Sequence, residues 1–198
     1  MSNQFKATLH DDSRRQLLTA AAGLIAAHAA GDAISSPKET KAASKTVGKA
    51  GDFNFLAGNW VVANKQLKKF GGTEWDTFAS EATVYTILAG AGSVEELRIP
   101  VKNFSGMGLR LLDVEKKIWV DHWVNAKSGV LTLPGSTGVF ENGVDIFDGG
   151  DWEDKGQKYL SRGVWDRITP TTCRWVQASS KDNGKTWQEN WVMDWTRA

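Results

Sequence analysis

The stretch "RWVQASSKDNGKTWQENWVMDWTR", Arg174 to Arg197, sets two apolar-rich runs on either side of Asn183-Gly184. Asn and Gly both tolerate positive φ, so this pair is a strong local signal for a β-hairpin turn. Asp182, just before it, can accept backbone N–H bonds across the turn. The stretch therefore predicts two antiparallel strands joined by a clamped turn, and the motif is expected to have a structural role.

The turn "SKDNGKTW", Ser180 to Trp187, also has the Ser-x-Asp-x-Gly-x-Thr-Trp pattern of the Asp box in sialidase blades. A sialidase-type propeller stacks several four-stranded blades of about 40–50 residues each. The chain has 198 residues, one such box and no internal repeat at that period. The length therefore excludes a propeller.

Upstream of the hairpin, from Asp52 onward, short strand-like runs follow one another at fairly regular intervals. They are "NWVVANKQL", "ATVYTIL", "SVEELRI", "MGLRLLD", "KIWVDHWV", "VLTLP", "GVFENGVDIF" and "YLSRGVWDRI". Gly, Asn, Asp or Pro lies in most of the gaps, and no run keeps helical spacing over more than two turns. This pattern predicts an all-β fold, an antiparallel up-and-down barrel of about eight to ten strands. Closure removes exposed edges and leaves room for a small ligand.

"FNFLAGNWVV" places Gly58-x-Trp60 at the head of the first strand, as lipocalins do. Together with the C-terminal hairpin, "TEWDTF", "ILAGAGSVEE", "LRLLDVEKKIWV" and "GVFENGV", it resembles an uncharacterised bacterial family of single lipocalin-like (calycin) domains, a domain of unknown function. The resemblance covers about Asp52 to the end and implies a barrel in which Trp60 plugs the closed end and Arg197 packs across it. The family lends no established reaction.

The first residues resemble an export signal. Ser13-Arg14-Arg15-Gln16-Leu17-Leu18 fits the twin-arginine pattern, and the apolar run that follows is too short to span a bilayer comfortably. Ala27-His28-Ala29 offers a cleavage site, and residues 31–33 offer a second. We expect a signal peptide over 1–33, a flexible Lys/Ser/Ala-rich linker over 34–51 and the barrel over 52–198, in the periplasm.

Charge and residue counts restrict the partners. Cleavage after Ala29 removes three basic and two acidic residues, so the formal net charge of +1 falls to zero. Without a basic patch, nucleic acid is not expected as a partner, and no membrane span is expected after signal removal. The single Cys173 excludes an internal disulfide, and His122 is the only histidine after the leader, which excludes multi-histidine metal sites. No cofactor is expected, except that a heme held by one histidine stays open. The oligomeric state is left open.

His122 and its neighbour Asp121 are the titratable pair in the strand "IWVDHWVN". Neighbours along a strand point to opposite faces, so only one of the two can face the barrel interior. An inward His122 could act as a general acid/base near neutral pH, or it could be a surface or hydrogen-bonded core histidine. The candidate ligand-binding residues are polar or indole side chains on strands: Trp60, Asn64, Arg110, Asp121, Trp123, Arg162, Gln177, Glu189 and Trp191.

Three functions remain open from the sequence. The first is a periplasmic module that binds a small hydrophobic, partly aromatic or amphipathic molecule. A barrel that holds Arg, Glu, Gln and Trp together would suit a ligand with an aromatic body and a carboxylate or hydroxyl tip. The second is a barrel enzyme, a lyase, isomerase or hydrolase, with His122 as acid/base. The third is a structural envelope protein without pocket chemistry.

Overall fold

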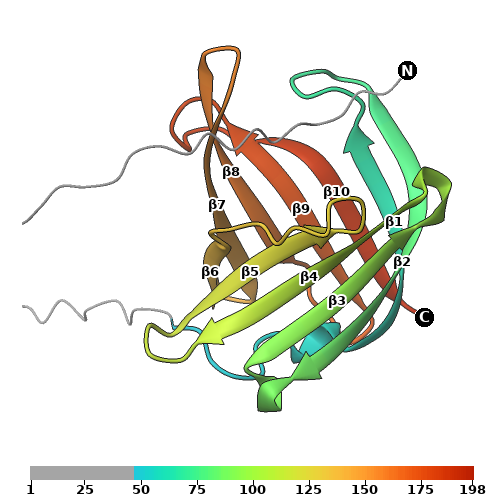
Figure 1. Ribbon diagram of the computed structural model, residues 1–198, viewed down its shortest axis with the longest axis vertical. Coiled ribbons are helices and arrows are strands. Elements are labelled where there is room, and N and C mark those ends of the chain that lie inside the picture. The colour runs from blue at the N-terminus through green and yellow to red at the C-terminus, as the bar shows by residue number, and fades with distance from the viewer. Residues whose placement is uncertain (1–46) are drawn as a thin grey trace, which may run out of the picture. The chain divides into compact units, whose positions relative to one another are not determined.

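The protein is a closed antiparallel β-barrel of ten strands (Figure 1). The computed structural model describes residues 47–198, so the predicted signal and most of the predicted linker lie outside the described residues. Each strand pairs with its neighbours in sequence, and β1 closes the ring against β10. The strands are β1 Gly58–Leu67, β2 Trp75–Ile87, β3 Gly92–Ile99, β4 Phe104–Asp113, β5 Ile118–Asn125, β6 Ser136–Glu141, β7 Val144–Asp154, β8 Gln157–Asp166, β9 Thr172–Ser180 and β10 Gln188–Arg197. This confirms the predicted up-and-down barrel.

Three short 3-10 turns complete the secondary structure of the described residues: η1 Asn54–Leu56, η2 Leu88–Gly90 and η3 Pro100–Lys102. The run "VLTLP", Val130 to Pro134, was expected to be a strand, and this expectation is wrong. It forms a single bridge, Leu131 to Val124, within the β5–β6 loop. β6, not this run, pairs with the first half of β5, from Trp119 to Asp121.

The Asp box is the tight turn between β9 and β10. Asp182 accepts hydrogen bonds from the Thr186 backbone N–H at 2.9 Å, the Thr186 hydroxyl at 2.6 Å and the Ser180 hydroxyl at 2.7 Å. The hydrogen bonds from Thr186 lower the pKa of Asp182 to about 2, because they favour the charged carboxylate. Asn183 and Gly184 take positive φ values of 57° and 81°, as the turn requires. The motif thus clamps the closing hairpin.

Asp182→Ala is expected to lower the melting temperature at neutral pH without changing ligand binding. A carboxylate with a depressed pKa stabilises the fold fully above the ordinary pKa of about 3.9, and the contribution is lost as the pH falls toward 2. The difference between wild type and mutant should therefore shrink as the pH falls from 4 to 2. Thermal melts across that range, beside Asp194→Ala as an exposed control, check this. Native melting with lost binding would contradict the structural role.

The closed end of the barrel is plugged around Trp60. Its indole is 1% exposed and donates to the Leu56 carbonyl at 2.7 Å. The Arg197 guanidinium lies 4.3 Å from the ring centroid and donates to the carbonyls of Phe55 and Ala57. Gly58 has φ +125°, and a Cβ there would lie 2.6 Å from Arg197 Nη1, so only glycine fits. The expected packing of Arg197 across Trp60 is confirmed.

Candidate functional site

The barrel interior holds a cavity of about 390 Å³. Strand directions place the β1–β2, β3–β4, β5–β6, β7–β8 and β9–β10 connections at the end opposite the Trp60 plug, and we call this the open end. The β1–β2 and β7–β8 hairpins extend there (Figure 1). The cavity is bordered by residues of β3 to β10 and by Thr132 and Pro134 of the β5–β6 loop. Its wall includes five indoles, Trp123, Trp165, Trp175, Trp191 and Trp195.

Strand β5 turns Asp121, and not His122, toward the centre of the barrel. Trp119 on the same face is fully buried, and Asp121 Oδ1 lies 3.7 Å from Nε of Arg110. His122 stands on the other face, where its Nδ1 lies 3.2 Å from the Thr132 carbonyl oxygen. A carbonyl only accepts, so this bond requires a proton on Nδ1. His122 borders the cavity together with Thr132 and Pro134 of the β5–β6 loop.

A buried ion pair lies at the base of the cavity. Arg110 Nη2 donates to Glu95 Oε2 at 2.7 Å, and both side chains are 4% exposed. The guanidinium lies between the rings of Phe53 and Trp165, at 5.4 and 5.1 Å from their centroids. Its Nε and Nη1 have no hydrogen-bond partner. Because a buried charge is tolerated only when compensated, Glu95 and Arg110 depend on each other.

Two further carboxyl groups lie within electrostatic range of Arg110. Burial raises the pKa of Asp121 to about 6, against the lowering effect of Arg110. Burial likewise raises the pKa of Asp145 to about 7, with Arg110 again opposing the shift and Asp121 and Asp52 adding to it. Asp145 is fully buried on β7, and neither carboxyl oxygen has a hydrogen-bond partner. One cation thus faces three carboxyl groups.

Asp145→Asn should stabilise the protein at pH 8 and flatten its pH dependence. An acid with a raised folded-state pKa stabilises the fold below the unfolded value of about 3.9, and this is lost as the pH rises through about 7. Replacing the buried carboxylate by a neutral amide should raise the free energy of unfolding at pH 8 by about 1–3 kcal/mol. Urea unfolding at pH 5 and pH 8 measures this, with the exposed Asp151→Asn as control. A destabilised mutant at pH 8 would contradict it.

The other sequence candidates divide between the cavity and its surroundings. Gln177 and Trp191 border the cavity, and so does Arg162, whose guanidinium lies 4.0 Å from the ring centroid of Trp187. Asn64 is buried behind the wall, where it accepts from Trp191 Nε1 at 3.0 Å and donates to the Ser80 hydroxyl at 2.7 Å. It therefore orients the Trp191 indole. Trp60 belongs to the plug, and Glu189 is half-exposed, 3.9 Å from Arg174, outside the cavity lining.

Glu95, Asp145 and the indoles of Trp165, Trp175 and Trp195 were not among the sequence candidates. For Glu95 a signal existed: in "SVEELRI" it alternates with Leu97 and Ile99, which share its buried face. For Asp145 the local pattern points the wrong way, because its apolar neighbour Ile146 is 48% exposed.

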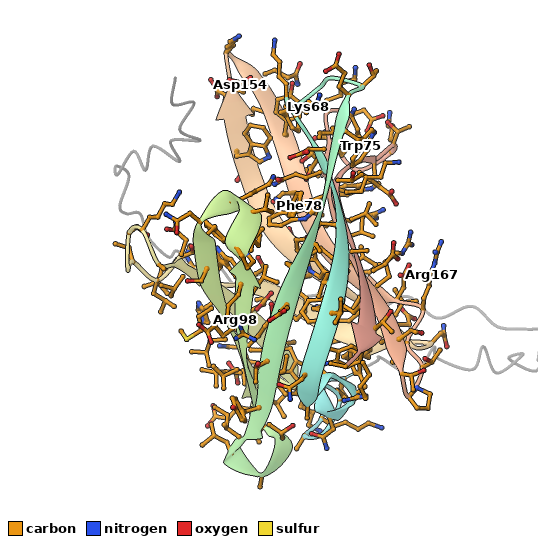
Figure 2. The ribbon with its side chains drawn as sticks, turned by 90° about the vertical axis from the view of Figure 1, so that its right-hand side faces the viewer. Lys68, Trp75, Phe78, Arg98, Asp154 and Arg167 are labelled. Carbon is orange, nitrogen blue, oxygen red and sulfur yellow. The ribbon has the colours of Figure 1, made fainter. Side chains whose placement is uncertain are left out.

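An aromatic bridge, Phe70, Trp152 and Tyr159, joins two hairpins at the open end. Phe70 of the β1–β2 loop lies 4.8 Å from Trp152 and 4.9 Å from Tyr159, and those two rings stack at 4.7 Å. Figure 2 shows the neighbouring Lys68 and Asp154 at that same end. Aromatic pairs contribute about 0.5–1.5 kcal/mol each beyond burial. The bridge therefore fixes the β7–β8 hairpin against the β1–β2 loop.

Among residues 47–198, no group of three or more His, Cys, Asp or Glu side chains is placed to hold a metal ion. Heme ligation by His122 stays a prediction. Cys173 is a buried strand residue, as expected, and burial raises the pKa of its thiol to about 12, so it is not nucleophilic near neutral pH. No helix in the described part of the chain has the length and apolarity to cross a membrane.

No protein-family model matches the chain, and no curated protein matches it. A solved structure that resembles it is a protein of unknown function from the DUF3598 family of Nostoc punctiforme PCC 73102, 11% identical, with a TM-score of 0.43. The match covers 78% of this chain and 50% of that one, so the chain spans about half the length of that protein. The ten-stranded barrel itself is consistent with an uncharacterised calycin-like domain of unknown function.

Proposed function

We propose that the barrel binds a small, partly aromatic molecule in its interior cavity. The observation that carries the proposal is a cavity of about 390 Å³ with five indoles in its wall and the Arg110–Glu95 pair at its base. Small-molecule sites are typically concave spaces of about 300–1,000 Å³, mostly apolar, with a few placed polar groups. An amphipathic ligand with an aromatic body fits this combination of surfaces.

The wall has features that hold its rings in place. Trp175 and Trp191 pack edge to face at 6.0 Å, and Asn64 fixes the Trp191 indole by a hydrogen bond. Trp123 lies directly over Gly106, where a Cβ would come within 2.3 Å of its ring. Glycine at this position is what allows the indole to lie against β4. Preorganised rings lower the entropy lost when a ligand binds.

The test uses the neutral aromatic dye N-phenyl-1-naphthylamine, whose fluorescence rises in apolar surroundings. We expect saturable binding with one site per chain. Trp123→Ala and Trp191→Ala should each weaken it about tenfold or more, because each removes an aromatic wall partner. Trp75→Ala removes a half-buried indole that does not line the cavity and should leave binding unchanged. Absence of binding, with the protein folded, would favour the structural envelope role.

An enzyme that uses His122 as acid/base has less support, because the ring lies on the strand face opposite Asp121 and bonds to Thr132. We expect His122→Asn and His122→Phe to bind the dye with wild-type affinity. Titration of binding from pH 5 to pH 8 in both variants measures this. If either variant loses a pH dependence of binding that the wild type shows, His122 takes part in the site. That result would contradict our assignment and support the enzyme hypothesis.

We also infer that the protein is exported by the twin-arginine route to the periplasm. The support is the Ser13 to Leu18 pattern, the short apolar run after it and the cleavage site at Ala27-His28-Ala29. Replacing Arg14 and Arg15 together by Lys should leave the precursor in the cytoplasm. Cell fractionation with an antibody to the protein measures this. Mature periplasmic protein from the Lys-Lys variant would contradict the route.

A further inference from the structure

We propose that the molecule held by this barrel carries a positively charged amine, seated between Asp121 and the cavity indoles. The inference rests on the proposed binding function and adds the chemical class of the ligand. It differs from the carboxylate or hydroxyl tip expected from the sequence, because the structure places the interior arginine among a surplus of carboxyl groups.

The positive charge of Arg110 is already compensated by carboxyl groups of the protein and is not available to an anionic ligand. Its Nη2 is bonded to Glu95 at 2.7 Å, and its Nε faces Asp121 at 3.7 Å. Asp145 adds a third carboxyl group within electrostatic range. Arg162, the other cation that borders the cavity, lies over the Trp187 ring, and its buried Nε has no hydrogen-bond partner. An anion placed beside Asp121 would meet like charge in a poorly solvated space, which is strongly unfavourable.

Asp121 is the carboxyl group that a ligand can reach. Its side chain is 23% exposed and lines the cavity, whereas Glu95 is paired and Asp145 is fully buried below. Its Oδ1 is buried beside Arg110 Nε without a hydrogen bond, so a ligand would approach the other carboxylate oxygen. An ammonium group here would donate to Asp121 and offset the carboxyl surplus. Such charge-assisted hydrogen bonds are stronger than those between neutral groups.

The surrounding indoles suit the same group. Trp123 stands two residues from Asp121 on the same face of β5, and Trp165, Trp175 and Trp191 continue the wall. Indole faces attract cations within about 6 Å of the ring centroid. The protein already uses this contact twice near the cavity, where Arg110 lies over Trp165 and Arg162 lies over Trp187.

The pairing must depend on pH through Asp121. The charged groups around it are Arg110 on β4, Glu95 on β3 and Asp145 on β7, with His122 as its chain neighbour. Burial raises the pKa of Asp121 to about 6. Below that value the carboxyl group is neutral and loses its attraction for a cation. Affinity for an amine should therefore rise as the pH increases from 5 to 8, and affinity for an anion should fall.

The experiment compares three probes with one skeleton: 3-phenylpropylamine, 3-phenylpropan-1-ol and 3-phenylpropionate. Calorimetry on the full chain should show the amine binding at least about tenfold more tightly than the other two at pH 8. At pH 5 that preference should largely vanish. Asp121→Asn should lose the preference for the amine over the alcohol at pH 8. Asp194→Asn, which removes an exposed carboxylate of β10, should behave as wild type.

The pH comparison in the wild-type protein keeps the test valid if Asp121→Asn does not fold. Binding of N-phenyl-1-naphthylamine without a preference for the amine at pH 8 overturns the ligand class and leaves the binding function standing. If the propionate binds more tightly than the amine at pH 8, the ligand class is likewise overturned and the binding function still stands. Failure of the dye and of all three probes overturns both proposals.

Discussion

Arg110→Met should lower the free energy of unfolding by about 3–5 kcal/mol. The substitution leaves the Glu95 carboxylate, whose side chain is 4% exposed, without its cation. It also removes the positive charge that lies near Asp121 and Asp145. A broken buried pair is costly because the remaining charge is neither solvated nor paired. Urea unfolding at pH 7 measures the loss.

Two variants show whether the loss comes from the stranded charge. Adding Glu95→Leu to Arg110→Met should restore most of the stability, because an apolar pair can replace a buried ion pair at little net cost. Arg98→Met breaks an exposed pair with Glu96 and should change stability by less than about 1 kcal/mol. If Arg110→Met costs no more than Arg98→Met, the interior pair does not stabilise the barrel as described.

Trp60→Ala is the second large effect, with an expected loss of about 3–5 kcal/mol, the usual range for a large buried aromatic side chain. It removes an indole that is 1% exposed, its hydrogen bond to Leu56 and the ring beneath Arg197. Denaturant unfolding measures it, and Trp75→Ala, a half-buried indole, should cost clearly less. If Trp60→Ala and Trp75→Ala lower the free energy of unfolding equally, the packing around Trp60 does not stabilise the barrel more than a half-buried indole does.

The fold could be predicted because the turn and strand signals in the sequence are local and each is consistent with the barrel that forms. Asn183-Gly184 requires a hairpin, the short alternating runs require strands, and Gly58-x-Trp60 with Arg197 marks the closed end. Each of these depends on residues close in sequence or on one recognisable pair. None requires knowledge of which strand face is buried.

The site could be predicted only in part, because it depends on which face of each strand points inward. On β5 both faces are largely apolar, with Trp119 and Trp123 beside Asp121 and with Ile118, Val120 and Val124 beside His122, so the sequence does not choose between the two faces. On β7 the apolar Ile146 suggests the wrong face, and the structure buries Asp145 instead. The pairing of β7 with β6 and β8 determines which face is buried. Phe147, which shares the buried face with Asp145, lies opposite Gly138 of β6 and Gly163 of β8. Such pairings are long-range and leave no mark in a single strand.

The seam between β1 and β10 also has a consequence for the order of folding. Every other strand pair joins neighbours along the chain and can form as a local hairpin, whereas Trp60 must find Arg197 from the far end of the domain. Contacts of such high sequence separation carry the largest loop-closure entropy and form slowly. We therefore expect ring closure to limit the folding rate. Until then the chain is an open sheet with two free edges, which invites exchange of β10 between two copies.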